Sequence, residues 1–192
     1  MGYTICKKPA FIFTHIPKTG GTSLFSRQSN VQKQIAPYCS GLKVMNGHRY
    51  LRNFTGGCAY IKLKDYFKFS IVRNPYDRFV SLWLTKNKDM PFSQFINKVK
   101  QGKFPWKPLH SQTSWIATLE GIILTDHLIR YEVYEDDIQR TFKKLGLPWI
   151  KLPHLRKTDR YEDYKVYYDT QDKIDFVANY YANDLKNFNY SF

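Results

Sequence analysis

The feature that most constrains this sequence is an apolar stretch that runs directly into a turn with two glycines and then into residues that favour a helix. Residues 11–16 are mostly apolar and β-prone, and the turn after them consists of Pro17, Lys18, Thr19, Gly20, Gly21, Thr22 and Ser23. Glycines let a backbone approach an anion closely, and the first N–H groups of a helix point toward it. Lys18 adds a positive charge, and the hydroxyl groups add hydrogen-bond donors. The stretch therefore predicts a strand, a phosphate-binding loop and a helix N-terminus.

The order of residues in this loop differs from the order in nucleotide hydrolases. In their GxxxxGK[ST] loops the lysine follows the second glycine and precedes a hydroxyl that binds magnesium. Here Lys18 precedes both glycines. An ordinary strand followed by a Gly-Gly turn is the alternative, and the loop residues alone leave both interpretations open.

A second candidate anion site follows the apolar run 67–72. Arg73 comes directly after this predicted strand, and a guanidinium there can bind two phosphate oxygens at once. Asn74 fits the N-cap of a helix whose first residue is Pro75. Ser81 lies about two turns into that helix and can add a hydroxyl to the same anion.

The remaining pattern predicts an α/β fold. Strands and helices alternate, which is typical of a parallel sheet covered by helices on both faces. Ligands of such sheets bind beyond the carboxyl ends of the strands, so we expect Lys18 and Arg73 to face one crevice. The other strands are predicted over residues 42–45 and 124–131, and the helices over residues 22–34, 91–100, 110–119, 135–145 and 170–187, besides the one that begins at Pro75.

Composition indicates one folded domain over residues 1–192. The chain is 43% hydrophobic and 17% aromatic, and its net charge is +14. Such a charge attracts polyanions: nucleic acid, acidic polysaccharide, anionic lipid or a multiply phosphorylated nucleotide. No apolar run is long enough to span a membrane and no signal peptide is evident. We therefore expect a soluble, cytoplasmic protein, or a Golgi-lumen protein if the chain is a trimmed domain.

The three cysteines, Cys6, Cys39 and Cys58, show no CxxC spacing. Free thiols are therefore expected, although one disulfide is compatible with the count. The sequence also lacks the HxxEH and CxxC motifs and any acidic cluster typical of metal sites, so we expect no metal cofactor.

Two motifs together resemble the sulfotransferases that use 3′-phosphoadenosine 5′-phosphosulfate (PAPS). They are HIPKTGGTS at residues 15–23 and RNPYDRFVS at residues 73–81, and the resemblance is to the carbohydrate branch that includes the heparan sulfate 2-O-sulfotransferases. It implies a P-loop-like parallel sheet flanked by helices, the sulfotransferase variant of the nucleoside triphosphate hydrolase fold. It also implies transfer of a sulfuryl group from PAPS to a hydroxyl acceptor, expected to be a saccharide, with adenosine 3′,5′-bisphosphate as the second product.

The same resemblance implies roles for individual residues. Lys18 and the N–H groups from Thr19 to Ser23 are expected to hold the 5′-phosphosulfate, with Pro17 in the same loop. Arg73 and Ser81 are expected to bind the 3′-phosphate.

Roles in catalysis and in further contacts are also expected. The resemblance implies that Lys18 of the first motif and His48 are catalytic, and His48 occupies the place of the general base of the 2-O branch. Arg156 and Lys157 lie in an LRKT-like stretch expected to contact the donor or the acceptor. Structural roles are expected for His15 and Arg78, and the acceptor pocket is expected to involve Gln112, Ser114 and Trp115.

Two other functions compete with this interpretation. A P-loop nucleotide kinase would need magnesium and a lysine after the glycines, and this chain lacks that order. A non-catalytic nucleic-acid-binding domain is suggested by the charge of +14 and the 15 tyrosines. The basic residues form no aromatic–basic repeat, so no nucleic-acid partner is expected.

Overall fold

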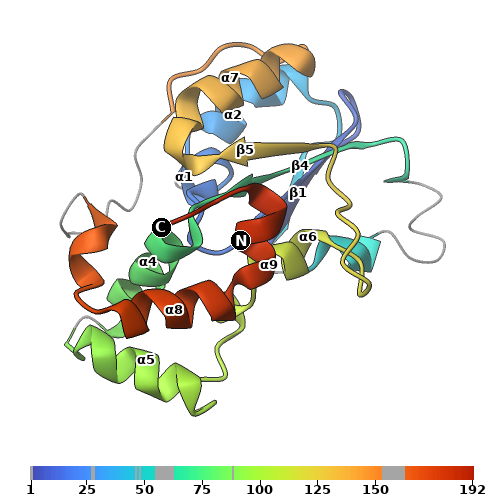
Figure 1. Cartoon of the computed structure of the whole chain (residues 1–192). Coiled ribbons are helices and arrows are strands. Elements are labelled where there is room, and N and C mark those ends of the chain that lie inside the picture. The colour runs from blue at the N-terminus through green and yellow to red at the C-terminus, as the bar shows by residue number, and fades with distance from the viewer. Residues whose placement is uncertain are drawn as a thin grey trace. The chain divides into compact units, whose positions relative to one another are not determined.

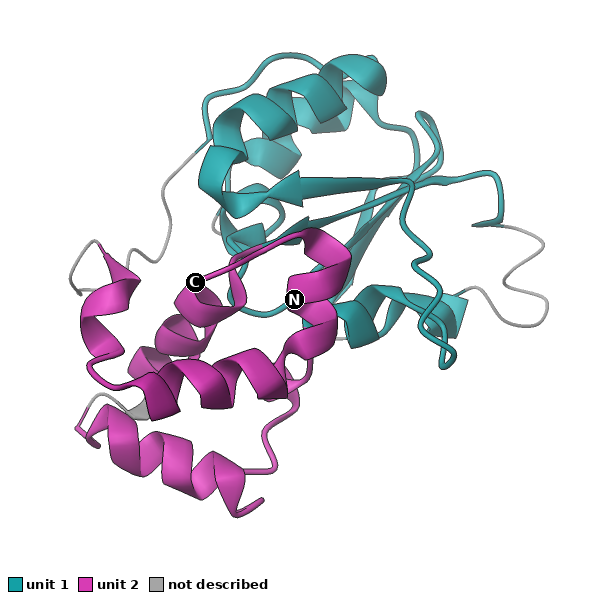
Figure 2. Ribbon diagram, viewed as in Figure 1, with its two compact units in different colours: residues 1–72, 112–156 teal, residues 73–111, 157–192 magenta. Residues whose placement is uncertain are grey.

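The computed structural model describes residues 2–26, 29–45, 47, 49–54, 63–87, 89–152 and 163–192. The chain forms two compact units (Figure 2). The first combines residues 1–72 with 112–156, and the second combines residues 73–111 with 157–192. Each unit has its own cluster of buried apolar side chains. In the described parts of both units, no helix combines the length and the apolar character needed to cross a membrane.

The first unit is built on a five-stranded sheet with the strand order β3-β1-β2-β4-β5 (Figure 1). Strands β2, β4 and β5 are parallel, whereas β1 pairs antiparallel with both β2 and β3. The parallel centre and the flanking helices confirm the predicted α/β class, and the predicted strand 67–72 is confirmed as β4. The strand bounds are β1 Tyr3–Cys6, β2 Phe11–Thr14, β3 Lys43–Met45, β4 Phe67–Val72 and β5 His127–Arg130.

One face of this sheet carries the apolar core of the first unit. Phe13 lies opposite Phe69, and Ile71 lies opposite Ile129, so their side chains point to the same face. Three helices cover this face (Figure 1). They are α1 (Gly21–Leu24), α2 (Val31–Ile35) and α7 (Tyr134–Lys144). The side chains between the sheet and these helices are almost completely buried, which fixes β2 and the loop that follows it.

The other face is covered within the first unit by η2 (Leu51–Phe54) and α6 (Gln112–Ile116), which contact each other. Because side chains alternate along a strand, Tyr3 of β1 points to this face. Its ring lies 4.2 Å from the ring of Phe54, centroid to centroid. The sheet is thus sandwiched, as a parallel sheet requires.

The second unit is helical and packs around α4 (Pro75–Asn87), which contacts α5, α8, η3 and η5. Phe79 of α4 is completely buried, and its ring lies 5.2 Å from that of Phe95 and 6.2 Å from that of Tyr181. The predicted helix 91–100 is confirmed as α5. The other bounds are α5 Phe92–Lys100, η3 Lys107–Leu109, η5 Tyr164–Tyr167, α8 Gln171–Tyr180 and α9 Ala182–Phe188.

The predicted helix over residues 22–34 is wrong, because α1 ends at Leu24 and α2 begins only at Val31. Serine side chains explain the break. The Ser29 hydroxyl donates to the Ser23 carbonyl (2.7 Å) and lies 3.2 Å from the Leu24 carbonyl oxygen. Such side-chain hydrogen bonds satisfy backbone groups that a continuing helix would use.

Three other predicted elements are shorter or divided. The helix over 170–187 is divided into α8 and α9 at Tyr181, whose φ of −115° and ψ of 29° are not helical. The Tyr181 hydroxyl donates to the Leu109 carbonyl (2.8 Å), which ties the break to the core of this unit. The helix over 110–119 shortens to α6, and the strand over 124–131 shortens to β5.

Candidate functional site

The loop between β2 and α1 has an unusual backbone. Lys18 has a φ of 68° and Gly20 a φ of 85°, so both residues are left-handed. Glycine adopts this conformation freely, but for lysine it costs roughly 1–2 kcal/mol. Between them Thr19 is completely buried, and its hydroxyl donates to the Ile16 carbonyl (2.9 Å). The fold thus holds Lys18 in a conformation that the residue itself disfavours, which is a common property of functional sites.

Both glycines of the loop are required by their surroundings. A Cβ atom on Gly21 would lie 2.2 Å from Cδ2 of His15 and 3.1 Å from Cζ of Phe13. A Cβ atom on Gly20 would lie 2.9 Å from Cε2 of Tyr131. His15 and Phe13 are both buried, so neither ring can move aside easily. His15 therefore contacts the loop through packing, in line with the structural role expected for it.

The first turn of α1 provides donors at the end of this loop. Gly20 is the N-cap residue, and its carbonyl accepts from the N–H of Ser23 (2.9 Å). The Ser23 N–H is therefore used within the turn. Within the described ranges, the N–H groups of Gly21 and Thr22 have no hydrogen-bond acceptor. Two such donors beside a lysine fit a phosphate or sulfate group.

Two tyrosines that follow β5 close one side of the loop. Tyr131 belongs to η4 (Tyr131–Val133), and Tyr134 begins α7. The Tyr134 hydroxyl donates to the Gly20 carbonyl (3.3 Å). Burial, together with the neighbouring Tyr131 and Glu135, raises the pKa of the Tyr134 phenol. Tyr134 therefore stays neutral and adds no negative charge beside the loop. Sequence reasoning missed both tyrosines, although their place at the carboxyl end of a parallel strand was a usable signal.

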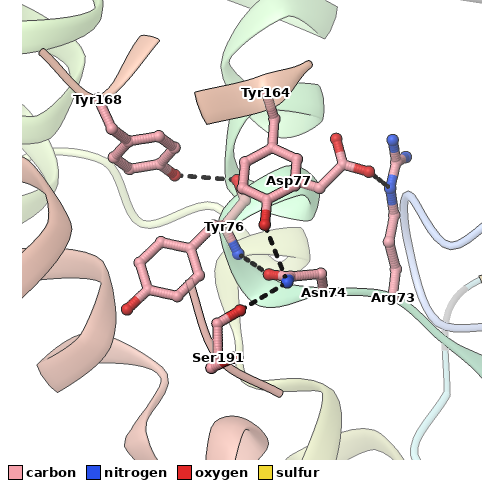
Figure 3. Close-up of polar contacts among 7 residues, drawn as sticks. All are labelled: Arg73, Asn74, Tyr76, Asp77, Tyr164, Tyr168 and Ser191. Carbon is pink, nitrogen blue, oxygen red and sulfur yellow. Dashed lines mark hydrogen bonds and ion pairs between the residues drawn. The ribbon is translucent and has the colours of Figure 1, made fainter. Parts of the chain in front are cut away.

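The second motif begins where β4 ends, with Arg73 as the residue after Val72. Arg73 is 5% exposed, and its Nε donates to Oδ2 of Asp77 at 2.7 Å (Figure 3). Asn74 caps α4 as predicted, because its Oδ1 accepts from the backbone N–H of Tyr76 (3.0 Å). The guanidinium is thus held by the first turn of the helix that it precedes.

The other residues of this motif lie along α4. Ser81 is 3% exposed, and its carbonyl accepts from the hydroxyl of Thr85 (2.7 Å). Arg78 is completely buried and donates through NH2 to the carbonyls of Pro108 and His110. These contacts lie inside the helical unit, which agrees with the structural role expected for Arg78.

The other predicted site residues are those outside the two motifs. His48, Arg156 and Lys157 lie outside the described residues. Of the predicted acceptor-pocket residues, Gln112 and Trp115 are completely buried. The Trp115 ring lies 4.8 Å from that of Tyr50, and the Ser114 carbonyl accepts from Arg52 (2.7 Å). A ring contact and a hydrogen bond thus connect α6 to residues 50–54 of the same unit.

The profile of the sulfotransferase family matches residues 1–191, almost the whole chain. No curated protein and no solved structure matches the chain. The match includes both motifs, the loop with Lys18 and the stretch from Arg73 to Ser81.

Proposed function

The chain belongs to the sulfotransferase family, and we propose that it uses PAPS as donor and a carbohydrate hydroxyl as acceptor. The observation that carries this proposal is the loop after β2. There Lys18 and Gly20 are left-handed, and α1 begins with N–H donors beside the lysine. This geometry suits a terminal phosphosulfate, since an anion can meet backbone donors and a cation together.

The loop residues would bind the 5′ end of the donor. When bound, PAPS supplies the sulfuryl group and leaves as adenosine 3′,5′-bisphosphate. The N–H groups of Gly21 and Thr22 and the hydroxyls of Thr22 and Ser23 would donate to its 5′-phosphate. Lys18 would offset the negative charge that develops on the oxygen between phosphorus and sulfur. Loss of one such preorganised donor typically lowers a rate by about 100-fold or more.

Arg73 and Ser81 would bind the 3′-phosphate of the same donor. A guanidinium can donate two parallel hydrogen bonds to a phosphate, which fixes both position and orientation. The burial of Arg73 supports this role, because an ionic contact is stronger where water is excluded. Ser81 lies on the helix that Arg73 precedes, so both belong to one rigid segment.

His48 would act as the general base. Its ring nitrogen would accept the proton of the acceptor hydroxyl as that oxygen bonds to sulfur and the sulfur–oxygen bond of the donor breaks. General bases commonly contribute about 100- to 10,000-fold to a rate. Arg156 and Lys157 would contact the donor or the acceptor. These three roles rest on the family resemblance of the sequence.

Turnover of radiolabelled PAPS with a panel of saccharides tests the proposal. Lys18→Ala and His48→Ala should each nearly abolish transfer, and His48→Ala should still bind adenosine 3′,5′-bisphosphate. Lys33→Ala is the matched control for Lys18, because it removes an exposed lysine from the same unit. Undiminished turnover by Lys18→Ala would overturn the role of the loop.

A further inference from the structure

The ion pair between Arg73 and Asp77 is short and shielded from water. Nε of Arg73 lies 2.7 Å from Oδ2 of Asp77, and the two side chains are 6% and 11% exposed. The residues are one helical turn apart, with Asp77 in the first turn of α4. The carboxylate is therefore favourable there, close to the positive end of the helix dipole.

The hydrogen bond in this pair also constrains the orientation of the guanidinium. A guanidinium is planar and rigid, so one hydrogen bond to Nε restricts the direction of the whole group. In Figure 3 the terminal nitrogens of Arg73 extend away from the Asp77 carboxylate. These nitrogens are the ones that form a bidentate contact with a phosphate. Asp77 thus holds the arginine by one edge and leaves its phosphate-binding side directed elsewhere.

The backbone from which Arg73 extends is held by residues near the end of the chain. Nδ2 of Asn74 donates to the hydroxyl of Tyr164 (3.1 Å) and to the carbonyl of Ser191 (2.9 Å) (Figure 3). Oδ1 of the same side chain caps α4 through the N–H of Tyr76. A single amide therefore connects the start of α4 to η5 and to the C-terminal segment.

The C-terminal segment is anchored by aromatic packing. The ring of Phe192 lies 5.0 Å from that of Tyr76 and 5.4 Å from that of Tyr168. The Tyr168 hydroxyl donates to the Tyr76 carbonyl (2.9 Å). The last residues of a domain are usually poorly ordered unless contacts of this kind hold them. Here they converge on the residues next to Arg73.

We propose that Asp77 is a positioning residue that directs the Arg73 guanidinium toward the 3′-phosphate of the donor. Asn74 and the C-terminal residues 190–192 hold the backbone beside it. The inference rests on the proposed function, in which Arg73 binds that phosphate. It identifies a group that sets the preference for a 3′-phosphorylated nucleotide without touching the nucleotide itself.

Charge and positioning predict opposite effects for Asp77→Ala. The substitution removes a negative charge beside the phosphate site, so charge alone would tighten binding of adenosine 3′,5′-bisphosphate. If Asp77 positions Arg73, binding weakens instead. We expect a loss of about 10- to 100-fold, by analogy with the loss found when a group that orients a metal ligand is removed.

The measurement is metal-free titration calorimetry with adenosine 3′,5′-bisphosphate and with adenosine 5′-monophosphate. The dissociation constant of the monophosphate divided by that of the bisphosphate reports on the 3′-phosphate alone. Asp77→Ala should lower this ratio and leave binding of the monophosphate unchanged. Asp77→Asn keeps an oxygen acceptor for Nε and should retain most of the ratio. Tyr164→Phe and Phe192→Ala should lower it by smaller factors.

Asp169→Ala is the matched control, because Asp169 forms an i,i+4 ion pair with Lys173 in the same unit and with the same charge. The control should leave the ratio unchanged. If the unaltered protein does not prefer the bisphosphate, the proposed function itself fails. If it does prefer the bisphosphate but Asp77→Ala keeps or raises the ratio, the positioning role of Asp77 is wrong and the proposed function stands.

Discussion

The left-handed backbone of Lys18 predicts that glycine and alanine substitutions there will differ in stability although both lose activity. With a φ of 68°, Lys18 is strained, and any residue with a Cβ atom at this position carries the same cost of roughly 1–2 kcal/mol. Glycine avoids the cost but gives the unfolded chain more freedom, which offsets about 0.4–1 kcal/mol. Lys18→Gly should therefore be more stable than Lys18→Ala by about 1 kcal/mol.

The same two substitutions at Lys33 provide a control, because there the alanine variant should be more stable than the glycine variant. Lys33 is exposed and lies within α2, where glycine is less favourable than alanine by roughly 1 kcal/mol. Free energies of unfolding from urea titrations followed by circular dichroism would give both differences. Lys18→Gly and Lys18→Ala should each lose about 100-fold or more of the sulfuryl-transfer rate.

Two results would refute this reasoning. Greater stability of Lys18→Ala than of Lys18→Gly would show that the backbone at this position is not left-handed. Normal turnover by either variant would show that the side chain does not assist transfer. Two results are therefore required together. The difference in unfolding free energy between the glycine and alanine variants must have opposite signs at Lys18 and Lys33, and both Lys18 variants must lose sulfuryl-transfer rate.

Three further predictions concern packing, pH and metal. Gly21→Ala should lose about 1–3 kcal/mol of stability through overlap with His15, and the double variant Gly21→Ala/His15→Ala should lose less than the sum of its parts in urea titrations. Burial disfavours ionisation of Asp137, but hydrogen bonds from the backbone N–H of Arg130 and from Arg140 outweigh it and lower the pKa of the carboxyl. Its contribution to stability should therefore be complete above the ordinary pKa of 3.8 and should disappear as the pH falls through the lowered value. Asp137→Asn should flatten the acid limb of a plot of unfolding free energy against pH. Chelation with EDTA should leave transfer from PAPS unchanged, whereas a magnesium-dependent kinase would stop.

Elements with strong periodic patterns and clear end signals were predictable from sequence. The strand 67–72, the cap at Asn74 and the helix that ends before Gly102 all agree with the structure. Each depends on local chemistry: an apolar run, a side chain that caps a helix, and a residue with a φ of 65°.

Features that depend on distant contacts were not predictable. Strand β1 was missed because a short segment of four residues is a strand only through its pairing with β2 and β3. The break after Leu24 depends on the hydrogen bonds of the Ser29 hydroxyl to the carbonyls of Ser23 and Leu24. Within the candidate site, the turn between strand β2 and helix α1 followed from its own residues. The packing of Tyr131 against Gly20 joins residues more than 100 positions apart.

The most direct test of the central claim is the fate of the label when the unaltered protein is mixed with radiolabelled PAPS and a saccharide panel in the presence of EDTA. If the protein transfers a sulfuryl group from PAPS to a saccharide, label appears on a saccharide and adenosine 3′,5′-bisphosphate forms in equal amount. Label that stays on PAPS with every acceptor, together with phosphate transfer from ATP once magnesium is added, would contradict it.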